Sequence, residues 1–152
     1  DEPLIDPQMI DFLATNMIEQ TGLKVATLIR RIEDAADLSN PNVVKVVINR
    51  NNEAMYFSRQ AIPFVRDFPV DSWLEHGVYY KHVGMYAYTS QALMAIEKLH
   101  MHPYEALEKL EQLTWIAHGL SIECYETNME SIGIDTEEDL KAVTSMIAEL
   151  ED

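Results

Sequence analysis

The chain has 152 residues, of which 47% are hydrophobic and 24% are charged, and its formal net charge is −15 at pH 7. That composition is typical of a folded globular domain and excludes a disordered chain. Nucleic acids and anionic membranes repel a protein so acidic, so neither is expected as a partner. The sequence holds one cysteine, Cys124, and no apolar run approaching a membrane span. We therefore expect no internal disulfide and a reducing, cytoplasmic location.

The first third of the chain is predicted to hold a helix, a strand and a short second helix. Asp6-Pro7 has the pattern of a helix cap followed by proline at the first helical position. The helix is expected to stop at Thr21-Gly22, and residues 24–32, which are apolar and partly β-branched, predict a strand. Residues 33–38 are expected to form a short helix or turn. The apolar residues at helical spacing in the first helix are Met9, Ile10, Leu13 and Met17.

The middle of the chain is predicted to form a β-hairpin, an irregular segment and a further strand. The hairpin joins residues 43–48 and 54–58 through the polar turn 49–52. Residues 60–80 contain two prolines and several aromatic residues without a regular period. Such a segment suits a subunit contact, so we expect an insertion that lies at an interface between subunits. Residues 82–89 are predicted to be the next strand.

The last part of the chain is predicted to alternate helices with one more strand. Helices are expected over residues 90–100 and 103–118, the second ending at Gly119, and a strand over 120–126. Thr136 is expected to cap a final helix. Its predicted buried stripe consists of Leu140, Val143, Ile147 and Leu150.

Strands and helices alternate along the chain, which predicts an α/β fold with a central mixed sheet and flanking helices. The length suits one domain over residues 1–152. The first helix has no strand before it, although an α/β fold should supply one. The sequence therefore looks like a domain that lacks its N-terminal portion.

The strand at 82–88 alternates strictly between two faces. Val83, Met85 and Ala87 are ordinary core residues. The opposite face carries an imidazole, two phenols and a glycine gap, in the order His82, Gly84, Tyr86 and Tyr88. That row predicts the floor of a polar small-molecule site, although a half-exposed structural strand would have the same pattern.

Two carboxylates are candidates for a metal site. Asp1 would follow a strand end and Asp135 would precede a helix, which are the places where open α/β sheets bind ligands. Together they suit Mg²⁺, a hard cation that takes oxygen ligands and substrate phosphates. The alternative is that Asp135 only caps a helix and Asp1 is a solvated terminal residue.

Further polar candidates lie on the predicted helix 103–118 and at the end of the hairpin. Arg59, at a strand end, can bind a carboxylate through two parallel hydrogen bonds, or it can be a surface residue. On the helix, a core stripe is predicted from Ala106, Leu107, Leu110, Leu113 and Ala117. A second face, suited to sugar hydroxyls or simply to solvent, is predicted from Glu108, Glu111, Gln112 and Trp115.

Taken together, these segments resemble the 3-deoxy-manno-octulosonate cytidylyltransferase family, the CMP-Kdo synthetases of lipopolysaccharide synthesis. The resemblance runs from end to end of the chain. The matching runs are Asp1-Glu2-Pro3-Leu4-Ile5, Asn40-Pro41-Asn42-Val43-Val44-Lys45-Val46-Val47, Ala54-Met55-Tyr56-Phe57-Ser58-Arg59 with Ile62-Pro63, Tyr80-Lys81-His82-Val83-Gly84-Met85-Tyr86-Ala87-Tyr88, Leu110-Glu111-Gln112-Leu113 and Gly133-Ile134-Asp135-Thr136-Glu137-Glu138-Asp139-Leu140.

The resemblance implies a Rossmann-like nucleotidyltransferase fold without its upstream nucleotide-binding segment, and a homodimer. It implies that the anomeric hydroxyl of the eight-carbon sugar acid Kdo attacks the α-phosphorus of CTP, giving CMP-Kdo and pyrophosphate. Mg²⁺ is then held by Asp1 and Asp135. The sugar pocket is then formed by Arg59, His82, Tyr86, Glu111 and Gln112.

Two positions depart from the family pattern. Thr114 stands where the family usually has arginine, and Glu137 stands where it often has proline. Because Thr114 removes a positive charge near the pocket, an 8-amino analogue of Kdo is an alternative substrate. A sialic-acid relative is a separate alternative. A non-catalytic fragment that serves only as a dimerisation or sugar-binding module is the other alternative.

Overall fold

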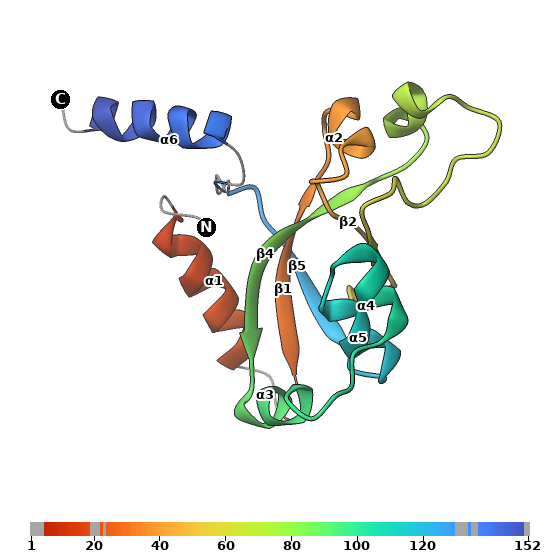
Figure 1. Cartoon of the computed structure of the whole chain (residues 1–152), viewed down its shortest axis with the longest axis vertical. Coiled ribbons are helices and arrows are strands. Elements are labelled where there is room, and N and C mark those ends of the chain that lie inside the picture. The colour runs from red at the N-terminus through yellow and green to blue at the C-terminus, as the bar shows by residue number, and fades with distance from the viewer. Residues whose placement is uncertain (1–4, 19–21, 23, 130–133, 135–136, 151–152) are drawn as a thin grey trace.

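Figure 1 shows the computed structural model of the chain, which describes residues 5–18, 22, 24–129, 134 and 137–150. The described part forms a five-stranded sheet in the order β3-β2-β4-β1-β5. β1 and β5 run parallel, whereas the other neighbouring strands run antiparallel. The predicted α/β class with a mixed central sheet is confirmed. The strands are β1 (Val25–Arg31), β2 (Lys45–Ile48), β3 (Ala54–Ser58), β4 (Tyr80–Tyr88) and β5 (Ile122–Glu126).

Helices cover both faces of this sheet. The longest of those nearest to it, α1, packs against β1 and β4 on one face, while α5 contacts β3 on the other (Figure 1). α1 starts as predicted, because the Asp6 carboxylate accepts a hydrogen bond from the Gln8 amide at 2.8 Å. The helices are α1 (Pro7–Ile18), α2 (Ala35–Ser39), the 3₁₀ helix η1 (Val70–Glu75), α3 (Ser90–Ile96), α4 (Pro103–Glu108), α5 (Gln112–Ala117) and α6 (Glu137–Leu150).

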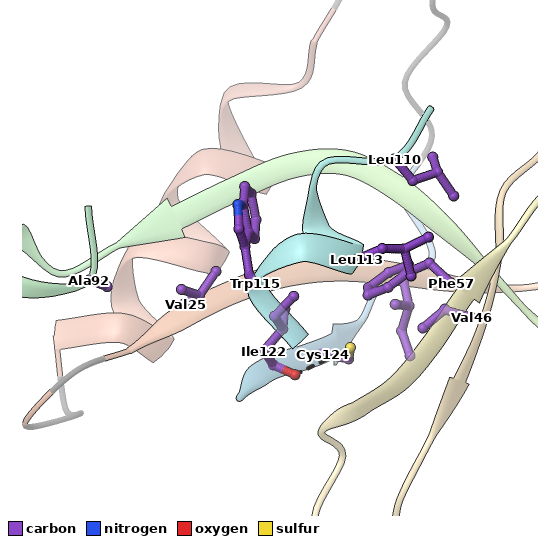
Figure 2. Packing of buried hydrophobic residues seen from close by; sticks show 10 residues of the cluster. Val25, Val46, Phe57, Ala92, Leu110, Leu113, Trp115, Ile122 and Cys124 are labelled. Atoms are coloured by element: carbon purple, nitrogen blue, oxygen red, sulfur yellow. Dashed lines mark hydrogen bonds between the residues drawn. The ribbon is translucent and has the colours of Figure 1, made fainter. Parts of the chain in front are cut away.

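The predicted alternation of β4 is confirmed. Val83, Met85 and Ala87 pack beneath α1 against a cluster that includes Met9 and Leu13. The opposite face of β4 meets the larger core, which lies between the sheet and α5 (Figure 2). Its buried members are Val25, Ile29, Val46, Phe57, Ala92, Leu110, Leu113, Trp115, Ile122 and Cys124.

A bulge interrupts the pairing of β4 with β1. Thr27 pairs with Tyr86, but the next residue, Leu28, pairs with Val83. Gly84 and Met85 therefore have no partner on β1. Because two residues are inserted, the alternation of faces is preserved across the bulge. A Cβ placed on Gly84 would meet no atom within 4 Å, so the predicted glycine gap is open space.

The prediction of a single helix over residues 103–118 is wrong. Lys109 adopts a left-handed conformation (φ 55°) and ends α4, and the chain restarts as α5 at a different angle. The interruption breaks the predicted stripe, because Leu110 and Leu113 are buried whereas Leu107 is 79% exposed. Ala106 and Ala117, also assigned to that stripe, are exposed as well.

The last helix forms over the predicted residues, but its predicted buried stripe is only partly correct. Val143 is buried, whereas Leu140 is 51% exposed and Ile147 is 38% exposed. Figure 1 gives the reason: α6 extends away from the sheet instead of lying across a face of it. A helix placed in that way buries only some of the apolar side chains on its predicted inner face. No helix among the described residues is long and apolar enough to cross a membrane.

Residues 60–80 are mostly irregular, as predicted, but they are anchored to the domain. Trp73 and Tyr79 are buried with Ile32 and Leu38 in a separate small cluster. The Tyr79 hydroxyl donates to the Pro63 carbonyl at 2.8 Å, and the Trp73 indole donates to the Phe68 carbonyl at 2.9 Å. The segment is thus held at its base while other aromatic side chains stay exposed.

Candidate functional site

The candidate site lies where the inner face of β4 meets α5. The rings of His82 and Tyr86 lie 5.1 Å apart, and Tyr86 meets Trp115 edge-on at 5.1 Å. Tyr88 contacts the same tryptophan at 5.7 Å. Gln112, three residues before Trp115 on α5, is 2% exposed. Tyr86 and Tyr88 therefore meet the same indole ring, and His82 packs beside Tyr86.

Two buried polar atoms at this place have no partner in the described part of the chain: the Tyr86 hydroxyl and the Gln112 Nε2. A buried polar group without a hydrogen bond costs on the order of 1–3 kcal/mol, so folded proteins normally satisfy such groups. Gln112 is 2% exposed and directly precedes Leu113, a member of the larger core. These two groups are therefore the candidates for hydrogen bonds to a polar ligand.

The phenols of the site stay protonated over the whole working range of pH. Burial, together with the negative charge of Glu111, raises the pKa of Tyr86 well above its ordinary value. The same causes raise the pKa of Tyr88 to about 12. Glu111 itself is exposed, so its carboxylate contacts solvent while its charge still affects the two phenols. Tyr86 can therefore donate a hydrogen bond to a ligand oxygen.

His82 is neutral at this site. Burial lowers the pKa of its imidazole to about 4. Its Nε2 lies 2.9 Å from the Thr27 hydroxyl, and Phe57 packs edge-on against the ring at 5.1 Å. The imidazole is therefore held between an apolar ring and a hydroxyl group, and it presents no positive charge to a ligand.

Arg59 is held by backbone carbonyl groups. Its Nε donates to the Glu108 carbonyl at 2.7 Å, and its Nη1 donates to the Pro41 carbonyl at 2.9 Å. These bonds use two of the five N–H groups of a guanidinium. The remaining N–H groups are available to a carboxylate, and the side chain is already oriented before a ligand binds.

Glu108 has a role that the sequence pattern did not predict. Its carboxylate accepts hydrogen bonds from the Ser58 hydroxyl at 2.7 Å and from the Arg59 amide at 2.9 Å. It therefore ties the end of α4 to the end of β3 and does not share a ligand face with Glu111. A break in the helix at Lys109 is what separates the two glutamates, and periodicity alone gives no sign of it.

Lys45 binds backbone carbonyl groups around Arg59. The residue is fully buried, and its ammonium donates to the carbonyls of Asn40, Val43 and Arg59 at 2.8, 2.6 and 2.6 Å. Burial lowers the pKa of the lysine, although Asp37 and Glu108 favour the charged form. A lone cation in an apolar strand is the only sequence signal from which the role of Lys45 could be inferred. It was missed because β-strand alternation alone does not distinguish a buried lysine from an exposed one.

Thr114 is not part of the pocket surface. It is 4% exposed, and its hydroxyl accepts a hydrogen bond from the His102 amide at 2.8 Å and donates one to the Glu105 carboxylate. The departure from the family pattern at this position is thus an internal link between α4 and α5. The second departure, Glu137, is exposed at the start of α6.

Asp1 and Asp135, the predicted metal ligands, lie outside the described residues. Within the described ranges, no group of three or more His, Cys, Asp or Glu side chains is close enough together to hold a metal ion. Nearby described residues do converge: Ile5 and Met129 pack against the same apolar cluster beneath α1.

Comparison with known proteins shows the family of the chain. The family described as cytidylyltransferase matches residues 1–131. The 3-deoxy-manno-octulosonate cytidylyltransferase of Cytophaga hutchinsonii is 46% identical over 95% of this chain and 57% of its own length. The protein of that name from Parabacteroides distasonis is 41% identical over 97% of this chain and 60% of its own length. The chain thus spans about three fifths of these relatives.

A solved structure gives the same answer for the fold. It is CMP:2-keto-3-deoxy-manno-octonic acid synthetase complexed with CTP, which superposes with a TM-score of 0.86 at 37% identity. The superposition covers 98% of this chain and 59% of the other. With the family match extending over most of the sequence, the chain belongs to the cytidylyltransferase family.

Proposed function

We propose that the intact protein transfers CMP from CTP to the anomeric hydroxyl of Kdo, giving CMP-Kdo and pyrophosphate. The relatives that match most of the chain have that name, and the similar solved structure is a complex with CTP. The observation that carries the proposal is the pair of orphan groups on Tyr86 and Gln112, which lie in the predicted sugar pocket. The test is release of pyrophosphate from CTP with Kdo, compared with 8-amino-Kdo and a sialic acid. Release only with a sialic acid would contradict it.

The pocket residues have separate tasks in this proposal. Gln112 Nε2 donates to an oxygen of the sugar, and the protonated Tyr86 hydroxyl donates to another. Arg59 binds the sugar carboxylate through N–H groups that the Glu108 and Pro41 carbonyls leave available. Phosphoryl transfer depends chiefly on such positioning and on neutralising charge, and it needs no covalent help from the protein.

We expect Arg59→Lys to weaken binding of the sugar acid about five- to tenfold while leaving CTP binding nearly unchanged. A lysine ammonium keeps the charge but loses the planar fork and both carbonyl bonds that orient it. The measurement is the KM for each substrate. Arg66→Lys is the matched control, because the Arg66 side chain is 90% exposed. A selective rise in the KM for CTP would place Arg59 at the triphosphate.

We propose further that Asp1 and Asp135 bind Mg²⁺, which when bound neutralises phosphate charge and lowers the pKa of the sugar hydroxyl. The support is the convergence of Ile5 and Met129 on one cluster, together with the family motifs at both aspartates. No step of the pocket chemistry described above depends on this assignment.

Asp135→Asn is expected to raise the Mg²⁺ concentration needed for half-maximal turnover by about tenfold, since one of two charged ligands is lost. The amide keeps the shape of the side chain and any capping role. A titration of turnover against Mg²⁺ measures the change, with Asp11→Asn on the exposed face of α1 as the control. An unchanged titration curve in the Asp135 variant would contradict the metal assignment.

We propose that the protein is a homodimer and that residues 60–80 form its contact. Phe64 is 75% exposed, Phe68 48% and Val78 49%, although the base of this segment is fixed by the buried Trp73. Exposed aromatic side chains on a fixed base are typical of a subunit interface.

Replacing Phe64 and Phe68 together with serine is expected to shift the protein from dimer to monomer at micromolar concentration, because each aromatic side chain lost removes a large apolar contact. Light scattering after gel filtration gives the mass, against 17.4 kDa for one copy of this chain. Leu107→Ser is the control, since that leucine is 79% exposed on α4, outside the segment. A double variant that keeps the mass of the parent protein rules this surface out.

A further inference from the structure

The Thr27 hydroxyl has three potential hydrogen-bond partners but only one proton to donate. Thr27 on β1 is fully buried. Its Oγ1 lies 2.7 Å from the Met85 carbonyl, 3.4 Å from the Val83 carbonyl and 2.9 Å from His82 Nε2. Two of these three neighbours can only accept a hydrogen bond, whereas the histidine nitrogen can either donate or accept.

The short contact with Met85, a residue of the β4 bulge, decides to which neighbour the Thr27 hydroxyl donates its proton. Met85 has no register partner on β1, and its carbonyl oxygen lies 2.7 Å from the Thr27 hydroxyl. If Thr27 donated to His82 instead, two oxygen atoms would face each other at 2.7 Å without a proton between them. Two oxygen lone pairs that close repel each other, so such an arrangement is costly. Thr27 therefore donates to Met85 and accepts from His82.

We propose that Thr27 is a positioning residue that holds His82 in the tautomer with its proton on Nε2, so that Nδ1 is a hydrogen-bond acceptor for a hydroxyl group of the sugar. The proposal rests on the function proposed above and deepens it. In this tautomer His82 accepts from a hydroxyl or amine of the ligand and repels a carboxylate oxygen. The sugar acid is then oriented with its hydroxyl toward His82 and its carboxylate toward Arg59.

Other contacts of His82 agree with this role. Phe57 and Tyr86 both pack at 5.1 Å from the ring and restrict its rotation. None of the described residues forms a hydrogen bond to Nδ1, which leaves that atom to a ligand. Burial lowers the pKa of the imidazole to about 4, so the ring is neutral and has one defined acceptor nitrogen at physiological pH.

The tautomer can be measured without reference to activity, by ¹⁵N NMR of the histidine side chains. His82 is identified among the five histidines by the signal that disappears in His82→Gln. We expect the Nε2–H form in the parent protein and in Thr27→Ser, which keeps the hydroxyl. Thr27→Val keeps the shape but removes the acceptor, so the Nδ1–H form should appear. Thr114→Val removes a buried hydroxyl elsewhere and should change nothing at His82. An Nδ1–H signal in the parent protein, or an unchanged tautomer in Thr27→Val, would overturn the proposal.

Kinetics of the intact protein then separate this inference from the proposed function. Thr27→Val should raise the KM for Kdo about three- to tenfold, leave the KM for CTP unchanged, and be rescued by Thr27→Ser. If the tautomer shifts as expected but the KM for Kdo does not move, the link from His82 to the sugar is wrong. If the parent protein releases no pyrophosphate with Kdo, the proposed function fails while the NMR result on Thr27 stands.

Discussion

Tyr86→Phe should make the protein more stable and less active at the same time. The Tyr86 hydroxyl is buried without a partner in the described structure, so removing it should raise the free energy of unfolding by about 1 kcal/mol or more. Tyr79→Phe is the matched control, because the Tyr79 hydroxyl is buried but donates to the Pro63 carbonyl at 2.8 Å. That variant should lose about 1 kcal/mol and keep full activity. Urea unfolding of the two variants measures these opposite shifts.

The same substitution should lower kcat/KM for Kdo about tenfold, because the bound sugar loses the hydrogen bond that the Tyr86 hydroxyl donates. Combining it with Gln112→Leu, which removes the second orphan group, should bring the loss to about a hundredfold while adding further stability. This exchange of stability for binding is what distinguishes a site from a packing defect. If both variants were stabilised and fully active, the orphan groups would have no part in sugar binding.

Acidification should destabilise the protein through His82. An unfolded histidine titrates near its ordinary value of 6.5, whereas burial lowers the pKa of folded His82 to about 4. As pH falls below 6.5 the unfolded state takes up a proton that the folded state refuses, so the free energy of unfolding falls. The loss grows down to pH 4 and reaches about 3 kcal/mol, after which both states are protonated.

The net charge of −15 acts in the opposite direction, because protonating carboxylates relieves repulsion in the folded state. The His82 contribution is therefore measured as a difference. Urea unfolding of the parent protein and of His82→Gln is followed at several pH values between 7 and 4. The parent protein should lose about 3 kcal/mol more than the variant across this range. Parallel curves for the two proteins would show that His82 is not held neutral by the fold.

The strand β4 was read correctly from sequence because its physical rule is local. Successive side chains of a strand point to opposite faces, so one heptapeptide was enough to place His82, Tyr86 and Tyr88 together. The bulge at Gly84 and Met85 did not disturb this result, since an even number of inserted residues preserves the faces. Rings that the pattern assigned to one side of the strand do meet in the structure.

The region 103–118 was read incorrectly because its outcome depends on residues far away in sequence. Leu110, Leu113 and Trp115 pack into the core beside Phe57, and that packing requires the chain to turn at Lys109 (Figure 2). Helical periodicity treats residues 103–118 as one rod and so groups Glu108 with Glu111. In the structure Glu108 instead holds the end of β3.

Sequence alone was sufficient to determine the α/β class, the order of the strands along the chain and the polar face of β4. Each of these depends on local periodicity or on matched residue types. Only the tertiary structure decided which polar side chains lack hydrogen-bond partners, because an unsatisfied atom is defined by everything around it. The same holds for Lys45 and Thr27, whose roles come from carbonyl groups that other strands and loops bring to them. Hydrogen bonds between distant segments leave no periodic trace in a sequence, and they decide how these side chains are oriented.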